Sequence, residues 1–187
     1  MDEAGRGPLA GPVVAAAVRL SRGNALLLAG ARDSKALSPG RRDIFFDLIR
    51  QNADSVSLAW SHPSRIDAEN ILRASLNAMS RAARRASRPG PAFVLVDGPF
   101  PLPGLSTSRQ EPLVKGDARS LAVACASIVA KVVRDRWMRR LSSRFPGFGF
   151  ERHKGYGTAG HLAALRALGP SKAHRLSFAP VRAARDK

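Results

Sequence analysis

Cysteine is nearly absent from this chain of 187 residues, and the single one, Cys125, leaves no intramolecular disulfide to form. A lone thiol is typical of a reducing compartment, so we expect a cytoplasmic protein. The sequence also has no apolar run of about 18 residues, which argues against a membrane-spanning helix. Acids at positions 2 and 3 argue against a signal peptide. We find no internal repeat and no low-complexity block.

Acidic residues are scarce too. The chain has 14 Asp plus Glu against 31 Lys plus Arg, a formal net charge of +17 and a sequence pI of about 11.7. Such an excess predicts a polyanionic partner, with nucleic acid favoured over a membrane surface because no long basic amphipathic helix dominates. The hydrophobic content of 44% is typical of a folded globular protein. We therefore expect a single domain over residues 1–187 that acts as a monomer.

The hydrophobic pattern predicts alternating strands and helices. Strands are expected at residues 9–20, 55–61, 92–96 and 111–115, and helices at 39–52, 64–87, 119–145 and 162–168. The helix at 64–87 keeps its periodicity except for one skip near Glu69. Its arginines are most simply a solvated face. We interpret residues 21–37, 99–110, 153–157 and the tail as loops. This order favours an α/β fold with a central mixed sheet flanked by helices, and a C-terminal helical extension over about 145–187 on the same core.

The few acids concentrate beside glycines, which suggests a site. Asp2 and Glu3 directly precede Gly5-Arg6-Gly7, and such an acid pair is unfavourable unless a cation binds it. Asp97 and Asp117 each close an apolar strand. An acid at the carboxyl end of a buried strand is where open α/β sheets place their chemistry. The spacing Gly-x-Gly-x-x-x-Gly over residues 5–11 is not a dinucleotide site, because a strand follows where a helix is needed.

Ordered motifs along most of the chain resemble the ribonuclease HII family, the type 2 ribonucleases H. They are DEAGRGPLAGPVVAAAV, DSKALS, IDAENIL, VLVDG, VKGDAR, ASIVAKVVRD, HKGYGT and HRLSFAPV, between Asp2 and Val181. The resemblance implies a ribonuclease H-like fold and cleavage of the RNA strand in RNA–DNA hybrids. It also implies incision 5′ of single ribonucleotides embedded in duplex DNA, leaving 3′-OH and 5′-phosphate ends.

The same resemblance implies metal ligands at Asp2, Glu3, Asp97 and Asp117, which would be the catalytic residues. Hard Mg²⁺ or Mn²⁺ prefers carboxylate oxygens, and four acids can hold two ions. One ion would lower the pKa of an attacking water while the other stabilises the leaving 3′ oxygen. The alternative for any single Asp is a turn or helix-cap role.

Substrate contacts are likewise implied by motif position. Gly5, Arg6 and Gly7 resemble the turn that senses the ribonucleotide 2′-OH, because glycines allow close backbone approach. Tyr156, the only tyrosine, resembles the residue that stacks on the sugar 3′ to the ribonucleotide, although it could instead be a half-buried core edge. Further candidates for backbone contacts are Lys35, Asn70, Lys131 and Lys154, with Ser34 and Ser127 in the same groove or as capping and packing residues.

Three functions remain open from sequence. The metal-dependent endonuclease is favoured over an inactive hybrid-binding relative and over a basic structural protein of ribosomes or the nucleoid, which would not need four acids at glycine-flanked strand ends. The type 3 relative shares the opening motif but usually carries a further N-terminal domain. One departure stands out: only Met1 precedes the acids, where the family has an apolar strand. We therefore expect a clipped first strand, and either a native start that lies upstream or a weakened enzyme.

Overall fold

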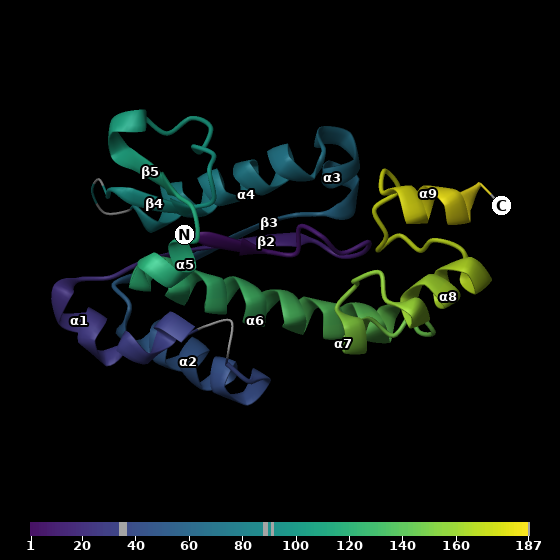
Figure 1. The fold of residues 1–187 in the computed structure, drawn as a ribbon, viewed down its shortest axis with the longest axis horizontal. Helices are drawn as coiled ribbons and strands as arrows, with labels where there is room; N and C mark the ends of the chain where they lie inside the picture. Colours follow the sequence, from purple (N-terminus) through teal and green to yellow (C-terminus); the bar gives the residue numbers. More distant parts are fainter. Residues whose placement is uncertain (34–36, 88–89, 91, 187) are drawn as a thin grey trace.

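The structure, a computed structural model, describes residues 1–33, 37–87, 90 and 92–186 (Figure 1). The predicted contacts Ser34 and Lys35 lie outside the described residues. The strands are β1 (Asp2–Ala4), β2 (Val13–Arg19), β3 (Ser55–Ser61), β4 (Val94–Asp97) and β5 (Gln110–Leu113). The α-helices are α1 (Arg22–Leu27), α2 (Pro39–Asn52), α3 (Pro63–Glu69), α4 (Ile71–Ala86), α5 (Gly116–Arg119), α6 (Leu121–Arg144), α7 (Phe150–His153), α8 (Ala159–Leu168) and α9 (Ala179–Arg185).

The strands form two ladders that meet at Met1. β1, β2 and β3 pair antiparallel in that order, and β4 pairs parallel with β5. The Met1 amine donates to the Leu95 carbonyl at 2.7 Å, and the Met1 carbonyl accepts the Asp97 N–H at 3.0 Å. β1 therefore lies between β2 and β4, which gives the mixed sheet that the sequence predicts. We expected a short first strand, and β1 has three residues; Met1, just before it, is buried and bonded on its β4 side.

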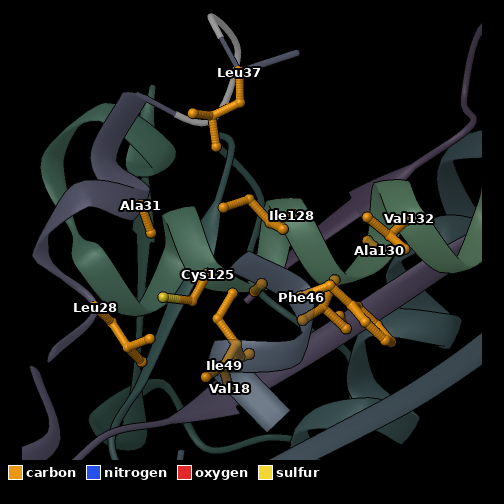
Figure 2. Packing of buried hydrophobic residues seen from close by; sticks show 13 residues of the cluster. Val18, Leu28, Ala31, Leu37, Phe46, Ile49, Cys125, Ile128, Ala130 and Val132 are labelled. Carbon is orange, nitrogen blue, oxygen red and sulfur yellow. The ribbon is translucent and has the colours of Figure 1, made fainter. Parts of the chain in front are cut away.

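Helices cover both faces of this sheet because successive residues of β2 point to opposite sides. Val18 packs in one buried cluster with Phe46 of α2 and Ile128 of α6 (Figure 2). Ala16 belongs to the same cluster. Ala15 and Ala17 pack on the other side against α4, in a cluster with Val96 of β4. The predicted burial of β2 on both faces is thus confirmed, although the strand begins at Val13 and not at residue 9.

The predicted helix at 64–87 is wrong as a single element. It is broken at Asn70, whose φ of 70° is incompatible with a continuous helix. The Asn70 side chain then accepts the Arg73 N–H at 3.0 Å and caps α4. The skip in periodicity at Glu69 was the sequence signal for this break. The helix at 39–52 and the strand at 55–61 are confirmed.

Short helices occupy segments predicted as loops. The 21–37 segment contains α1 and a 3₁₀ turn at Ala29–Asp33, and the tail contains α9. α7 ends where the glycine-rich 153–157 loop was expected to begin. The helix predicted from residue 119 is preceded by α5, so Asp117 lies in the first turn of a helix and not at a strand end. All five helical segments are too short for periodicity to be visible.

The C-terminal helices gather around the far end of α6 (Figure 1). Phe148 and Phe150 pack there with Met138 of α6 and with Ala10. Leu165 of α8 and Val181 of α9 pack on Leu9. This end of the molecule therefore supports the segment between β1 and β2. Among the residues described, no helix combines the length and apolar character that spanning a bilayer requires.

Candidate active site

The acidic residues meet where β1 lies beside β4. The backbone bonds of Met1 bring the end of β4, Asp97, next to Asp2. The Asp97 carboxylate accepts the Gly116 N–H at 2.7 Å, which holds the start of α5 and hence Asp117 at the same edge. Asp2 and Asp117 are 7% and 4% exposed. The sheet thus brings together acids that are far apart in the sequence.

This grouping leaves negative charge poorly compensated. Burial, followed by repulsion from Glu3 and Asp97, raises the pKa of Asp2 to about 7, against the bond from Ser127 that lowers it. Burial also raises the pKa of Glu3, although Arg6 opposes the shift. Buried carboxylates that repel one another favour a bound proton or a cation. Their oxygen donors are those that hard divalent ions prefer.

The acidic side chains are nevertheless not arranged as a complete metal-binding site. In the described part of the chain, no group of three or more His, Cys, Asp or Glu side chains is arranged as a metal-binding set. Asp2 and Asp97 each accept a backbone N–H instead, from Glu3 at 2.7 Å and from Gly116. The donor chemistry fits a divalent cation, and the acids would have to draw closer around it. The four-ligand set stays a prediction.

Glu3 also lines a cavity of about 450 Å³, whose wall includes several positively charged side chains. Its lining includes Gly5, Arg6, Gly7, Arg42, Ser127, Lys131, Arg134 and Tyr156. Arg6 lies 3.4 Å from the Glu3 carboxylate and is 46% exposed. The cavity therefore combines one acid of the cluster, Glu3, with basic side chains that suit a phosphodiester backbone.

The turn from Gly5 to Gly7 is held from inside by Arg175. This buried guanidinium donates to the carbonyl oxygens of Gly5 at 2.6 Å and Arg6 at 2.9 Å. A trans peptide points its N–H away from its C=O. Inward carbonyls at these positions consequently direct the N–H groups of Arg6 and Gly7 away from Arg175. Gly5 to Gly7 line the cavity, so these donors can meet a polar group bound in it.

A second buried arginine, Arg134 of α6, joins the segment that follows this turn to the Tyr156 loop. It donates to the carbonyls of Ala10 at 3.2 Å, Pro12 at 3.1 Å and Lys154 at 3.0 Å. Gly5 must be glycine here: its φ is 102°, and a Cβ would lie 2.0 Å from the Arg134 Nε. The turn and Arg134 therefore fit only because position 5 lacks a side chain.

Tyr156 lies against the glycine turn. It is 47% exposed, and a Cβ on Gly7 would meet its ring at 3.7 Å. The Leu9 N–H donates to the Gly155 carbonyl at 2.8 Å, which ties the two loops together. The alternative of a half-buried core edge fits less well, because the ring faces the cavity.

The remaining sequence candidates divide into two groups. Lys131 lines the cavity and bonds Asp135 at 2.8 Å, and Ser127 bonds Asp2. Lys154 turns back to donate to the Glu151 carbonyl, and Asn70 caps α4, so neither lines this cavity. Their backbone contacts stay predictions.

Sequence reasoning missed Arg42, Arg134 and Arg175. Arg42 lines the cavity and donates to the Leu37 carbonyl at 2.6 Å. Nothing in one sequence separates these arginines from the other basic residues. The only available signal was the position of Arg134 and Arg175 within the ASIVAKVVRD and HRLSFAPV motifs.

Comparisons with known proteins agree on one family. The sequence profile for "Ribonuclease HII" matches residues 1–181. The ribonuclease HII of Verminephrobacter eiseniae is 54% identical over 97% of this chain and 84% of its own. That of Geobacter sulfurreducens is 50% identical over 97% and 82%. The crystal structure of ribonuclease H2 from Pyrococcus horikoshii OT3 superposes with a TM-score of 0.75 and 25% identity, covering 99% of this chain and 95% of the other.

Proposed function

The chain belongs to the ribonuclease HII family and is therefore a ribonuclease H endonuclease, and from this premise we propose how its site works. Asp2, Glu3, Asp97 and Asp117 hold Mg²⁺ or Mn²⁺, two ions when substrate is present. The enzyme cleaves the RNA strand of RNA–DNA hybrids and incises 5′ of single ribonucleotides in duplex DNA. The products carry 3′-OH and 5′-phosphate ends.

The four acids supply the ligands. Burial and mutual repulsion destabilise their unpaired negative charges, and this favours the binding of a cation. Bound divalent ions would contribute an activated water and charge stabilisation at the leaving oxygen. Ser127 orients Asp2 through its hydrogen bond, and Gly116 orients Asp97. Arg6 lies beside Glu3 and offsets part of its charge before a cation arrives.

Recognition of the ribonucleotide belongs to the glycine turn and Tyr156. The N–H groups of Arg6 and Gly7 can donate to a 2′-OH, which DNA lacks. The Tyr156 ring, next to Gly7, can stack on the neighbouring deoxyribose and so favours an RNA-to-DNA junction. Arg6, Arg42 and Lys131 line the same cavity and suit the flanking phosphates. Lys35, Asn70 and Lys154 are further backbone contacts in this proposal.

The observation that carries the proposal is the grouping of Asp2, Glu3 and Asp97, of which Glu3 lines a basic cavity together with Gly5–Gly7. The test uses purified protein with Mg²⁺ or Mn²⁺ and a duplex carrying one ribonucleotide. We expect a nick 5′ of the ribonucleotide, and loss of the nick in Asp97→Asn. An all-DNA duplex is the matched control. Cleavage by Asp97→Asn at the wild-type rate would reject the metal-ligand assignment.

A weaker alternative is a catalytically poor or inactive hybrid-binding protein, motivated by the length of β1, which carries Asp2 and Glu3 on only three residues. It predicts binding of the duplex without cleavage under either ion. We further infer a monomer with one domain over residues 1–187, in which about 145–187 pack on the shared core, and a cytoplasmic location. Analytical ultracentrifugation tests the monomer, and a dimer at micromolar concentration would reject it.

A further inference from the structure

Consecutive hydrogen bonds connect Ser171, through the buried His174 and His161, to the backbone carbonyl of Tyr156. His161 Nδ1 lies 2.8 Å from the Tyr156 carbonyl oxygen. His161 Nε2 lies 3.1 Å from His174 Nε2. His174 Nδ1 accepts the Ser171 N–H at 3.0 Å. Three segments that are separate in sequence are thus joined through two imidazole rings.

The partners fix the tautomer of each ring. A carbonyl oxygen only accepts, so His161 must carry its proton on Nδ1 and leave Nε2 as an acceptor. The Ser171 N–H only donates, so His174 must accept on Nδ1 and carry its proton on Nε2. The His174 N–H then points at the free lone pair of His161. One arrangement of protons satisfies every bond, and both rings are neutral in it.

The surroundings keep these rings neutral and immobile. His161 and His174 are 0% and 2% exposed. Phe150 packs edge-on against His161, and the His153 ring stacks on it at 4.4 Å between centroids. Burial and the neighbouring histidines lower the pKa of His174 to about 4, and burial lowers that of His161. Because both rings are buried and uncharged, the His161–His174 pair can fix the position of the Tyr156 peptide in a way that a flexible surface contact cannot.

Tyr156 itself needs such support. Its side chain is exposed, and it follows Gly155, whose φ of 84° is open to few residues. Its N–H donates to the His153 carbonyl, and its carbonyl accepts the Thr158 N–H at 2.8 Å as well as the His161 Nδ1–H. The peptide that carries the ring is therefore held by two local backbone bonds and by one side-chain donor, His161.

We propose that His161 and His174 are positioning residues that hold the Tyr156 backbone, so that its ring is set for the sugar beside a ribonucleotide. This rests on the proposed function, in which Tyr156 contacts substrate. Neither histidine touches the substrate or the acids. Losing them should weaken substrate binding and leave the chemical step unchanged.

The experiment is a double-mutant cycle on the single-ribonucleotide duplex, with steady-state KM and kcat, and Kd by fluorescence anisotropy in the Asp97→Asn background. The variants are His161→Leu, Tyr156→Ala and the double variant. Tyr156→Ala keeps the backbone carbonyl, so it removes only the ring. His62→Leu, an exposed histidine outside this network, is the control. His161→Asn retains an N–H for the Tyr156 carbonyl but loses the bond to His174, which provides a milder variant should His161→Leu fail to fold.

We expect His161→Leu to raise KM and Kd about tenfold, a loss of about 1.4 kcal/mol, with kcat within twofold. In the Tyr156→Ala background the same change should have less than a twofold effect, because it acts through the ring. His161→Asn and His174→Gln should fall between His161→Leu and wild type. His62→Leu should match wild type.

Equal effects of His161→Leu with and without the Tyr156 ring would overturn the positioning role, as would a fall in kcat with KM unchanged. If Tyr156→Ala alone leaves KM and Kd at wild-type values, the substrate role of Tyr156 is wrong and this inference falls with it. Because Tyr156→Ala is measured separately, the two failures are distinguishable. If the wild type does not cut, the Kd cycle still decides the positioning role.

Discussion

Replacing Gly5 with alanine tests whether the glycine turn and Arg134 form one rigid unit. The added Cβ would lie 2.0 Å from the Arg134 Nε and 2.5 Å from its Cδ. Arg134 cannot swing aside freely, because it is 1% exposed and donates to three carbonyl oxygens. The backbone at Gly5, with φ of 102°, also disfavours any side chain.

Both effects can be given a magnitude. A non-glycine residue in this region costs about 1–2 kcal/mol. Displacing a buried guanidinium from one of its carbonyls costs about 1.5–3 kcal/mol per hydrogen bond, and we expect one or two bonds to be lost. The free energy of unfolding should fall by about 2.5–8 kcal/mol. For a domain of this size that lowers Tm by roughly 5–32 °C.

Thermal and urea unfolding followed by circular dichroism give the comparison. Gly160→Ala is the matched control, because this glycine is inside α8 and a Cβ there meets no atom within 4 Å. It should leave stability unchanged or raise it by up to about 1 kcal/mol. Should Gly5→Ala melt within about 2 °C of Gly160→Ala, a difference of at most about 1 kcal/mol at this size, the close fit between the turn and Arg134 would be refuted.

Four further outcomes follow from the same contacts. Arg175→Lys should lower the free energy of unfolding by about 2–4 kcal/mol in urea melts, because an ammonium cannot reach carbonyls on both Gly5 and Gly11 as the fork does; a loss under 1 kcal/mol would contradict this. The folded pKa of His174 is about 4 against an ordinary 6.5, so the unfolded chain binds more protons between these values. Its contribution is complete above pH 6.5 and is lost as pH falls toward 4, by up to about 3 kcal/mol, and His174→Gln should flatten the pH dependence of the urea midpoint. Cys125 is buried and burial raises its thiol pKa to about 12, so Ellman's reagent at pH 8 should react only after denaturation; rapid native labelling would refute this. Three apolar residues placed ahead of Met1 should raise Tm and activity by filling the cavity of about 160 Å³ between β2 and β4; an unchanged Tm and rate would show that the short β1 is not a weakness.

The acids of the candidate site were predictable because they are rare in a basic chain. Asp97 indeed closes a strand that pairs parallel with its neighbour. The context of Asp117 was predicted less well, since a four-residue helix has no periodicity to read. The long regular elements, such as α2 and β3, matched because several turns or alternations repeat the same signal.

The buried arginines and histidines that hold the loops of the site could not be predicted from the sequence. Arg134 donates to the Pro12 carbonyl and Arg175 to the Gly5 carbonyl, and each acceptor is more than 100 residues away in the sequence. Carbonyls are present at every residue, so no sequence pattern marks the acceptor. His161 and His174 pose the same difficulty, because their pairing depends on how α8 meets the segment after it.

The choice of carbonyl partners for the two buried arginines has a consequence for the site. Burial lowers the pKa of Arg134 to about 10 and of Arg175 to about 9, so both stay charged at neutral pH. A carboxylate partner would cancel that charge, whereas carbonyl dipoles satisfy the guanidinium and leave its positive charge in place. The Arg175 bonds also orient the peptides of the glycine turn, because a carbonyl held inward turns the N–H of its peptide the other way. Arg175 thereby shapes a donor surface, and both arginines keep positive potential beside a cavity suited to a polyanion, without using any of the scarce acids that the chain gathers at β1, β4 and α5.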